Sequence, residues 1–166
     1  MNLLVRTERA GDEADIRALT AAAFADMPHS GGSEPAIIDG LRASGDLALS
    51  LVAASEAGEI VGHIAFSPVT IEGGEVGWFG LGPVSARPDL QGQGIGSRLI
   101  EAGIDEMRMR GARGIVLVGD PLYYARFGFV PDPRLAYPHP GGEFLQRLIL
   151  SGEGTGGVVR YAPAFG

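Results

Sequence analysis

Apolar and polar residues are arranged along the first quarter of the chain in patterns that predict one strand and two helices. The short apolar run Leu3–Arg6 predicts a first strand, and the segment 12–24 places apolar residues at helical spacing behind an acidic first turn. A loop over Pro28–Gly32 leads to Ser33, a residue type that favours the N-cap of a helix, and a second, shorter helix follows. The chain is therefore expected to begin with a strand and two helices.

The middle of the chain consists of short runs rich in β-branched and apolar residues, as is typical of strands. Leu47–Ala54 and Ile60–Phe66 are joined by five residues that suit a hairpin, and we expect Val69–Ile71 to extend the meander past Pro68. The run Val76–Ala86 predicts a further strand. Together these segments predict an antiparallel meander.

A glycine-rich loop, a helix and another strand come next. The segment Gly94–Arg110 has apolar residues on one helical face and charged residues on the opposite face. Ile115–Val118 is a continuous apolar run, typical of a strand that is covered on both faces. Two strands joined by a helical crossover are expected to be parallel. Asp120 then occupies the N-cap of a short helix that runs through Arg126 and ends at Gly128.

The last part of the chain is less regular. Residues 131–142 are rich in proline and glycine and are predicted to form a loop, whereas Phe144–Leu150 fits either a helix or a strand. Val158–Tyr161 predicts a last strand, whose edge could pair between the two subunits of a homodimer. The pattern as a whole predicts a single domain over residues 1–166, of the mixed α/β class.

Length and composition narrow the class of protein. With 166 residues, 45% of them hydrophobic, the chain is long and apolar enough for one domain with a substantial core. No apolar run approaches the length of about 20 residues that spans a bilayer. Charged residues interrupt the segment 1–16, where a signal peptide would need an apolar core. We therefore expect a cytoplasmic protein that does not insert into a membrane.

The charge balance and the lack of cysteine exclude further classes. A net charge of −7 disfavours nucleic acid as a partner and favours cationic small molecules. Without cysteine the chain has no disulfide, no thiolate metal site and no cysteine nucleophile. We predict no metal site.

The strongest chemical signal is the segment Gln91-Gly92-Gln93-Gly94-Ile95-Gly96-Ser97, which we call the glycine loop. Glycines leave backbone N–H groups accessible, and the start of a helix adds unpaired amides and the positive end of its dipole. The loop therefore predicts a site for a phosphate-bearing ligand. A tight turn that serves packing alone is the alternative.

The glycine loop could belong to one of several known types of phosphate-binding loop. A P-loop is excluded, because no lysine followed by serine or threonine comes after the final glycine. The pattern of a dinucleotide-binding site fits better, because Asp120 follows the next strand and could bind a ribose hydroxyl. However, Ser97 stands where that pattern needs its third glycine. A site for S-adenosylmethionine has the same weakness.

Two motifs together resemble those of the GNAT acyltransferase superfamily. Gln91-x-x-Gly94-x-Gly96 is similar to its pyrophosphate loop, and Tyr124-x-x-x-Gly128-Phe129 is similar to its second recurrent motif. The longer strings 81–84, 119–121 and 123–129 resemble the YhbS-like branch of predicted N-acetyltransferases. The resemblance implies a central, mostly antiparallel sheet, with a parallel pair splayed around the cofactor and with flanking helices.

The resemblance also implies a cofactor, acetyl-CoA, with coenzyme A as the product. Backbone N–H groups of the glycine loop would bind the pyrophosphate, and the end of the preceding strand would pair with the pantetheine arm. The implied cofactor-binding residues are Val84, Ser85, Ala86, Gln91, Gly92, Gln93, Gly94, Ile95, Gly96, Ser97, Arg98 and Tyr124.

Transfer of the acetyl group by direct attack of a primary amine, in a ternary complex, needs a base and a proton for the departing thiolate. By the resemblance Tyr124 is the candidate general acid, and packing is its alternative role. His63 and Glu34 are the candidates for the base. A structural histidine and an exposed first-turn acid are the simpler interpretations of these two, and water could also take the proton.

The sequence thus predicts an acetyl-CoA-dependent N-acetyltransferase that acts on a small-molecule or peptide amine. A module that binds acyl-CoA as a sensor, without turnover, is the first alternative, and a nucleotide-dependent reductase or a methyltransferase is the second. The acceptor is expected to bind between the segments 28–40 and 131–144.

Overall fold

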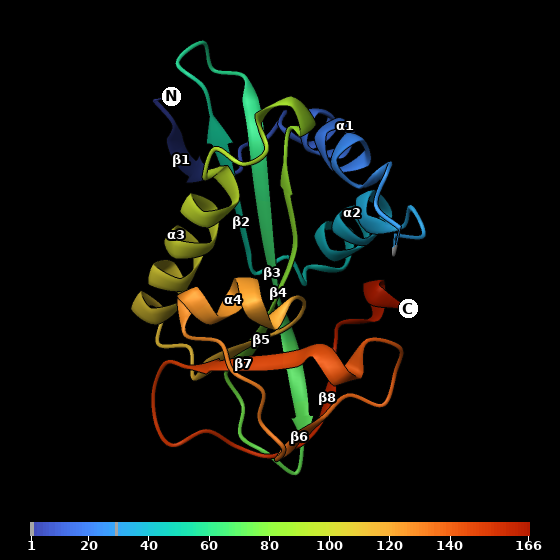
Figure 1. Cartoon of the computed structure of the whole chain (residues 1–166), viewed down its shortest axis with the longest axis vertical. Helices are drawn as coiled ribbons and strands as arrows, with labels where there is room; N and C mark the ends of the chain where they lie inside the picture. Colours follow the sequence, from blue (N-terminus) through green and yellow to red (C-terminus); the bar gives the residue numbers. More distant parts are fainter. Residues whose placement is uncertain (1, 29) are drawn as a thin grey trace.

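The structure, a computed structural model, describes residues 2–28 and 30–166 (Figure 1). Its helices are α1 (Glu13–Phe24), α2 (Glu34–Ser44), α3 (Ile95–Met109) and α4 (Pro121–Tyr124). Its strands are β1 (Leu4–Thr7), β2 (Leu49–Ala54), β3 (Ile60–Glu72), β4 (Trp78–Ala86), β5 (Gly114–Val118), β6 (Leu135–Ala136), β7 (Leu145–Ile149) and β8 (Gly157–Arg160). Short 3-10 turns lie at 88–90, 125–127, 142–144 and 163–165.

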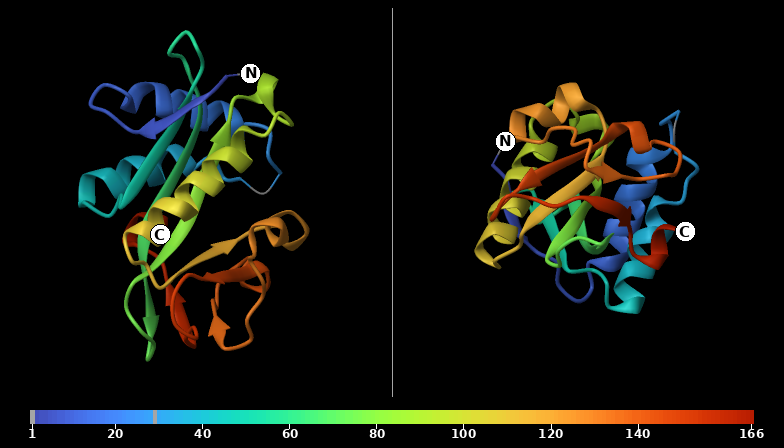
Figure 2. Two further views of the ribbon diagram at one scale, coloured as in Figure 1. Left: turned by 90° about the vertical axis from the view of Figure 1, so that its left-hand side faces the viewer. Right: turned by 90° about the horizontal axis from the view of Figure 1, so that it is seen from below.

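The strands follow the order β1-β2-β3-β4-β5-β7 across the sheet. Neighbours along this path are antiparallel, except that β4 and β5 are parallel, as the crossover through α3 predicts. Helices α1 and α2 cover one face of the sheet and α3 covers the other, as Figure 1 and Figure 2 show. The predicted mixed α/β fold with a mostly antiparallel sheet is therefore confirmed.

The parallel strands β4 and β5 are paired only over their first three residues, where residues 78–80 lie beside 114–116. Beyond this point β4 continues to Ala86 along β3, while β5 continues to Val118 along β7. The two strands diverge, which Figure 2 shows in its left view. One edge of residues 81–86 is thus left without a strand partner in the described part of the chain.

Helix α3 lies close against β3 because two glycines meet large side chains there. A Cβ atom on Gly103 would lie 2.3 Å from Cε1 of Phe66, and one on Gly62 would lie 2.5 Å from Cγ2 of Ile95. Neither position has room for a larger residue. This close contact fixes the start of α3, and with it the glycine loop, relative to the sheet.

Some segments differ from the sequence-based expectation. Strand β3 runs without a break through Pro68 and changes its partner from β4 to β8 at Thr70. The ambiguous segment 144–150 forms β7 because it pairs with β5, and the short β6 lies within the predicted loop 131–142. Strand β8 pairs with β3 and with β6. The edge predicted to pair between subunits is therefore occupied within the chain.

Helices α2 and α4 begin where the sequence predicts, but only one of the two predicted caps makes a side-chain hydrogen bond. The predicted loop 28–32 includes His29, which lies outside the described residues. Helix α2 begins directly after Ser33, as predicted, but the Ser33 hydroxyl makes no capping hydrogen bond within the described chain. Asp120 caps α4 as predicted, because its carboxylate accepts a hydrogen bond of 2.9 Å from the N–H of Leu122.

Candidate active site

A cavity of about 650 Å³ opens between the end of β4, the glycine loop, the first turn of α3 and the short helix α4. It is lined by Met27, Val84, Ser85, Ala86, Leu90, Gln91, Gly92, Gly94, Ile95, Gly96, Ser97, Ile100, Asp120, Tyr123, Tyr124 and Arg126. Ten of the twelve residues implied by the resemblance for cofactor binding are among them. The structure therefore brings the two sequence motifs together at one cavity, which we call the cofactor cavity.

The glycine loop contains a row of backbone N–H groups without partners. The first hydrogen bond of α3 runs from the N–H of Arg98 to the carbonyl of Gly94, so residues 95–97 precede the hydrogen-bond ladder of the helix. No hydrogen bond among the described residues uses the N–H groups of residues 92–97. These consecutive donors lie at the positive end of the α3 dipole, which is the arrangement that binds anions.

The glycines of the loop differ in whether the fold itself requires them. Gly92 and Gly94 have φ angles of 82° and 84°, so their backbone conformation alone favours glycine. Gly96 lies in the first turn of α3 outside that φ range, and the nearest atom to a Cβ built there is the Tyr123 hydroxyl, 3.8 Å away. Neither strain nor crowding within the described chain calls for glycine at this position.

Tyr124 lies half-buried in the wall of the cofactor cavity. Its ring packs edge to face against Tyr123, with 5.0 Å between the centroids, and against Phe129, with 6.0 Å. Burial, and to a smaller extent the neighbouring Tyr123, raises the pKa of Tyr124 to about 12. The phenol therefore keeps its proton at neutral pH.

Arg126 and Tyr123 are lining residues that the sequence interpretation did not assign to the cofactor. The Arg126 guanidinium lies over the Tyr123 ring, with Cζ 4.3 Å from the centroid, and the Tyr123 hydroxyl lies 3.2 Å from Oγ of Ser97. Among the described lining residues Arg126 carries the only full positive charge. Its place two residues after Tyr124, inside the second motif, is the signal that could have identified it.

Four candidate site residues do not line the cofactor cavity, and His63, the fourth of them, is described separately below. Gln93 is exposed, and Arg98 directs its guanidinium to the carbonyl of Leu3 at 3.4 Å. Glu34 lies at the start of α2, where its carboxylate accepts a hydrogen bond from the Ser30 hydroxyl. The structure thus gives Arg98 and Glu34 other partners.

His63 is fully buried in β3, on the sheet face opposite α3. Its Nε2 lies 2.8 Å from Oγ of Ser50, which in turn lies 2.6 Å from a carboxylate oxygen of Glu8. Burial lowers the pKa of His63 to about 4, partly opposed by the charge of Glu8. His63 does not line the cofactor cavity, but Ser85, directly opposite it on β4, does.

A second cavity, of about 760 Å³, shares Asp120 with the first. It is lined by Val118, Gly119, Asp120, Pro121, Pro140, Gly141, Glu143 and Phe144. The lining is mostly apolar, with two carboxylates and no basic side chain among its described residues. It lies partly on the segment 131–144, where the sequence predicts part of the acceptor site.

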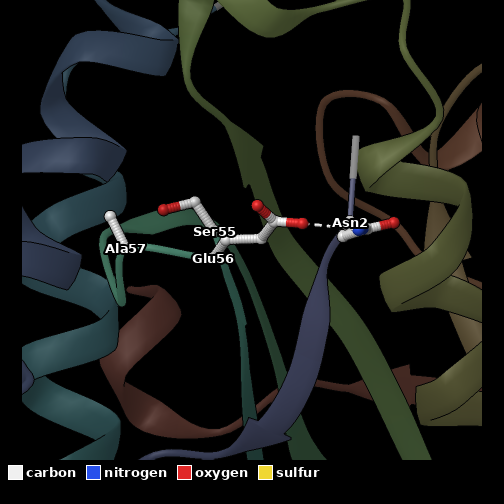
Figure 3. Close-up of a pocket in the computed structure, with 4 residues that line it drawn as sticks. All are labelled: Asn2, Ser55, Glu56 and Ala57. Carbon is white, nitrogen blue, oxygen red and sulfur yellow. Dashed lines mark hydrogen bonds between the residues drawn. The ribbon is translucent and has the colours of Figure 1, made fainter.

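A hollow near the start of the chain is not a site of this kind. Figure 3 shows Asn2 hydrogen-bonded to Glu56, beside Ser55 and Ala57 in the turn between β2 and β3. The Glu56 carboxylate already accepts a hydrogen bond from Asn2, and the hollow contains no residue of either sequence motif.

Metal ligands and long apolar helices would indicate other kinds of site. No group of three or more His, Asp or Glu side chains within residues 2–28 and 30–166 is placed to hold a metal ion. Across the same residues, every helix is too short or too polar to cross a membrane.

The chain is similar to known acetyltransferases along most of its length. The sequence model of the family described as "Acetyltransferase (GNAT) family" matches residues 16–129. The uncharacterized N-acetyltransferase YhbS of Escherichia coli strain K12 is 35% identical over 169 residues, covering 98% of this chain and 98% of YhbS. The uncharacterized N-acetyltransferase YjhQ of that strain is 39% identical over 98 residues, covering 56% of this chain and 54% of YjhQ.

Two solved structures have closely similar folds. One is a GNAT family acetyltransferase from Brucella melitensis in complex with acetyl-CoA, with a TM-score of 0.89, 45% identity, and 99% of each chain covered. The other is YhbS from Escherichia coli in complex with CoA, with a TM-score of 0.90 and 32% identity, covering 99% of this chain and 92% of YhbS. The fold implied by the two sequence motifs is therefore confirmed.

Proposed function

We propose, given that the chain belongs to the acetyltransferase (GNAT) family, that it transfers the acetyl group of acetyl-CoA to a primary amine. The observation that carries the proposal is the row of unpartnered N–H groups at residues 92–97 beside Tyr124 in one cavity. Unpartnered backbone amides can bind a pyrophosphate, and a phenol can donate a proton to a departing sulfur. The relatives bound to acetyl-CoA and to CoA support this choice of cofactor.

The residues present fit acetyl-CoA. Residues 92–97 and the Arg126 guanidinium would hold the pyrophosphate, with Gly96 leaving room for its oxygens. The free edge of Val84–Ala86 would hydrogen-bond the amides of the pantetheine arm. When bound, acetyl-CoA supplies an acetyl group activated as a thioester.

Tyr124 would act as the general acid. As the amine nitrogen bonds to the acyl carbon and the carbon–sulfur bond breaks, Tyr124 would hold its phenolic proton ready for the sulfur. A thiol has a reference pKa of about 8.5, so proton transfer from a phenol with a pKa of about 12 to the departing sulfur is uphill and needs assistance from the site when the cofactor is bound.

The second cavity would receive the acceptor. Because it shares Asp120 with the cofactor cavity, an amine bound there would lie next to the reacting centre. Asp120 and Glu143 favour a cation, and Val118 and Phe144, which are 39% and 47% exposed, favour an apolar body. The acceptor class that fits is a small or peptide amine with an apolar portion next to the amino group.

A non-catalytic acyl-CoA sensor is the second candidate. The one carboxylate among the described residues lining the cofactor cavity is that of Asp120, and one of its oxygens already caps α4. A cavity wall with so few groups that could act as the general base favours binding of acyl-CoA without turnover. The reductase and methyltransferase alternatives lose their support, because dinucleotide-binding folds need a wound, mostly parallel sheet.

The test is turnover. The protein is mixed with acetyl-CoA and a panel of amines, and free thiol is measured over time. We expect amine-dependent thiol release that falls about 100-fold or more in Tyr124→Phe, because general acid catalysis contributes about 10²–10⁴-fold. CoA should bind both proteins with equal affinity in calorimetry. Failure to bind CoA would overturn the proposal, and binding without thiol release for any amine would favour the sensor.

A further inference from the structure

Two buried polar atoms beside the cofactor cavity have no hydrogen-bond partner within the described chain, namely Nδ1 of His63 and Oγ of Ser85. Their residues are directly opposite each other on β3 and β4. Side chains in such positions share one face of the sheet, with Cβ atoms about 4.5–5.5 Å apart. Ser85 lines the cavity, and His63 lies buried behind it. Buried polar atoms nearly always have a hydrogen-bond partner, so the lack of one at both Nδ1 of His63 and Oγ of Ser85 needs an explanation.

The other ring nitrogen of His63 begins a chain of hydrogen bonds. Nε2 contacts Ser50, Ser50 contacts Glu8, and the Arg42 guanidinium donates to both carboxylate oxygens of Glu8 at 2.9 and 3.0 Å. Burial is the largest single effect and raises the pKa of Glu8, but hydrogen bonds from Arg42 and Ser50 outweigh it and hold that pKa below its usual value. Glu8 is therefore ionised at neutral pH.

The positions of the protons fix the tautomer of His63. An ionised carboxylate only accepts, so the Ser50 hydroxyl gives its single proton to Glu8. The Ser50 oxygen must then accept from His63, which places the ring hydrogen on Nε2. Nδ1 is left with a free lone pair. Nδ1 lies on the other side of the ring from the nitrogen that contacts Ser50. Nδ1 and Oγ of Ser85 are not hydrogen-bonded to each other in this structure, so a change of the Ser85 side-chain rotamer is needed to join them.

We propose that His63 takes up, through Ser85, the proton that the acceptor amine loses, and that Ser50 and Glu8 are the positioning residues that hold His63 ready for it. The proposal rests on the acetyl transfer proposed above. The acceptor attacks as the neutral amine, after its ammonium form has lost one proton to solvent. While the new nitrogen–carbon bond forms, a second amine proton passes to Oγ of Ser85 and the Ser85 hydroxyl proton passes to Nδ1. One N–H bond breaks at the amine and one forms at Nδ1. The proton returns through Ser85 to solvent after the product leaves.

The charges around His63 suit this task. Glu8, after β1, and Arg42, in α2, are the charged groups that act on His63, and the buried residues of α1 are Ile16, Leu19, Thr20 and Ala23, none of which is ionisable. A base with a pKa of about 4 does not deprotonate a free alkylammonium, whose pKa is about 10. It accepts a proton only from a nitrogen made acidic by bonding to the acyl carbon. Glu8 then balances the charge of the imidazolium through Ser50.

The test interrupts the relay at three points, with Ser85→Ala, Ser50→Ala and Glu8→Gln. Ser67→Ala is the matched control, because Ser67 is a buried serine on β3 that, like Ser85, has an unpartnered hydroxyl in the described chain but does not line the cavity. We expect kcat to fall about 10- to 100-fold in the three relay variants, within the range of general base catalysis. KM for acetyl-CoA and the affinity for CoA should not change. Ser67→Ala should keep the wild-type kcat, and Ser85→Thr, which retains the hydroxyl, should keep most of it.

The outcomes separate the relay from the proposed function. If wild-type protein transfers acetyl groups and all three relay variants keep its kcat, the relay is wrong and the transfer stands. If kcat falls equally in Ser67→Ala, or is not retained by Ser85→Thr, the serines have a structural role and the relay is also wrong. If wild-type protein binds CoA but transfers no acetyl group, the proposed function is wrong, and the relay, which depends on it, is wrong as well.

Discussion

The ring of Tyr124 lies directly against the backbone of Gly119, so that a Cβ atom at position 119 would stand 2.6 Å from Cε2 and 3.1 Å from Cδ2 of the ring. Gly119 does not have a positive φ, so its backbone conformation suits other residues as well. The missing side chain therefore makes room for the ring. In this way the residue after β5 sets the position of the phenol in the wall of the cofactor cavity.

Gly119→Ala is expected to displace Tyr124 and lower kcat about 10- to 100-fold, because a shift of about 1 Å in a reacting group can cost that much. Thiol release measures the effect, and calorimetry with CoA checks that the cofactor still binds. The double variant with Tyr124→Phe is the control. If Gly119→Ala acts through the phenol, the two losses will not add, whereas additive losses would contradict this interpretation.

Gly96→Ala is expected to weaken CoA binding about tenfold or more, which corresponds to about 1.4 kcal/mol. The added methyl group would occupy space that the pyrophosphate needs. Without ligand, the variant should be as stable as the wild type or up to about 1 kcal/mol more stable, because alanine favours a helix over glycine. Calorimetry with CoA and thermal unfolding measure the two effects.

Gly103→Ala is the matched control in the same helix. A Cβ atom there would lie 2.3 Å from Phe66, so this variant should lose about 1–3 kcal/mol of stability through overpacking. If Gly96→Ala bound CoA like the wild type, the glycine loop would not be the pyrophosphate site.

Local patterns predicted much of this fold because they act over short stretches of chain. The apolar face of α3, the cap at Asp120 and the parallel pair around the crossover all follow from neighbouring residues. Strand β7 could not be told from a helix, because its conformation is decided by pairing with β5, which is distant in the sequence. The short β6 likewise exists only through its pairing with β8.

The site was predictable where it depends on motifs and not where it depends on long-range contacts. The two motifs placed the glycine loop and Tyr124 at one cavity. The link from His63 through Ser50 to Glu8 was missed, because Glu8 and Ser50 are 42 residues apart and meet only where β1 ends beside β2. Arg98 was assigned to the cofactor by its position alone, whereas its side chain turns toward Leu3.

Glu143→Gln is expected to raise KM for a cationic amine about two- to fivefold with little change in kcat, because exposed charge pairs contribute at most about 1 kcal/mol. Added salt should raise KM in the wild type and not in the variant, since salt screens exposed charges. A weakly basic aromatic amine, neutral at the assay pH, is the control substrate and should not respond. An unchanged KM for the cationic amine would place the acceptor outside the second cavity.

The pH dependence of stability follows from the buried His63. Its pKa is about 4 in the folded protein and 6.5 in the unfolded chain, so the unfolded chain binds more protons between these values. Stability from this residue is therefore fully present above pH 6.5 and is lost as the pH falls toward 4. A tenfold difference in proton affinity between the two states corresponds to about 1.4 kcal/mol, so the total loss is about 3 kcal/mol.

Urea unfolding followed by the fluorescence of Trp78, the single tryptophan, measures this loss between about pH 7.5 and about pH 4.5. His63→Gln should be less stable than the wild type at the upper pH, because Gln packs less well in place of the ring, but its free energy of unfolding should fall less steeply toward the lower pH. The lowered pKa of Glu8 acts in the same direction at a lower pH, because its stabilisation is lost only as the pH falls below about 4.5. Parallel pH curves for the two proteins would mean that His63 has the same pKa in the folded and unfolded states, which would contradict the effect of burial argued here.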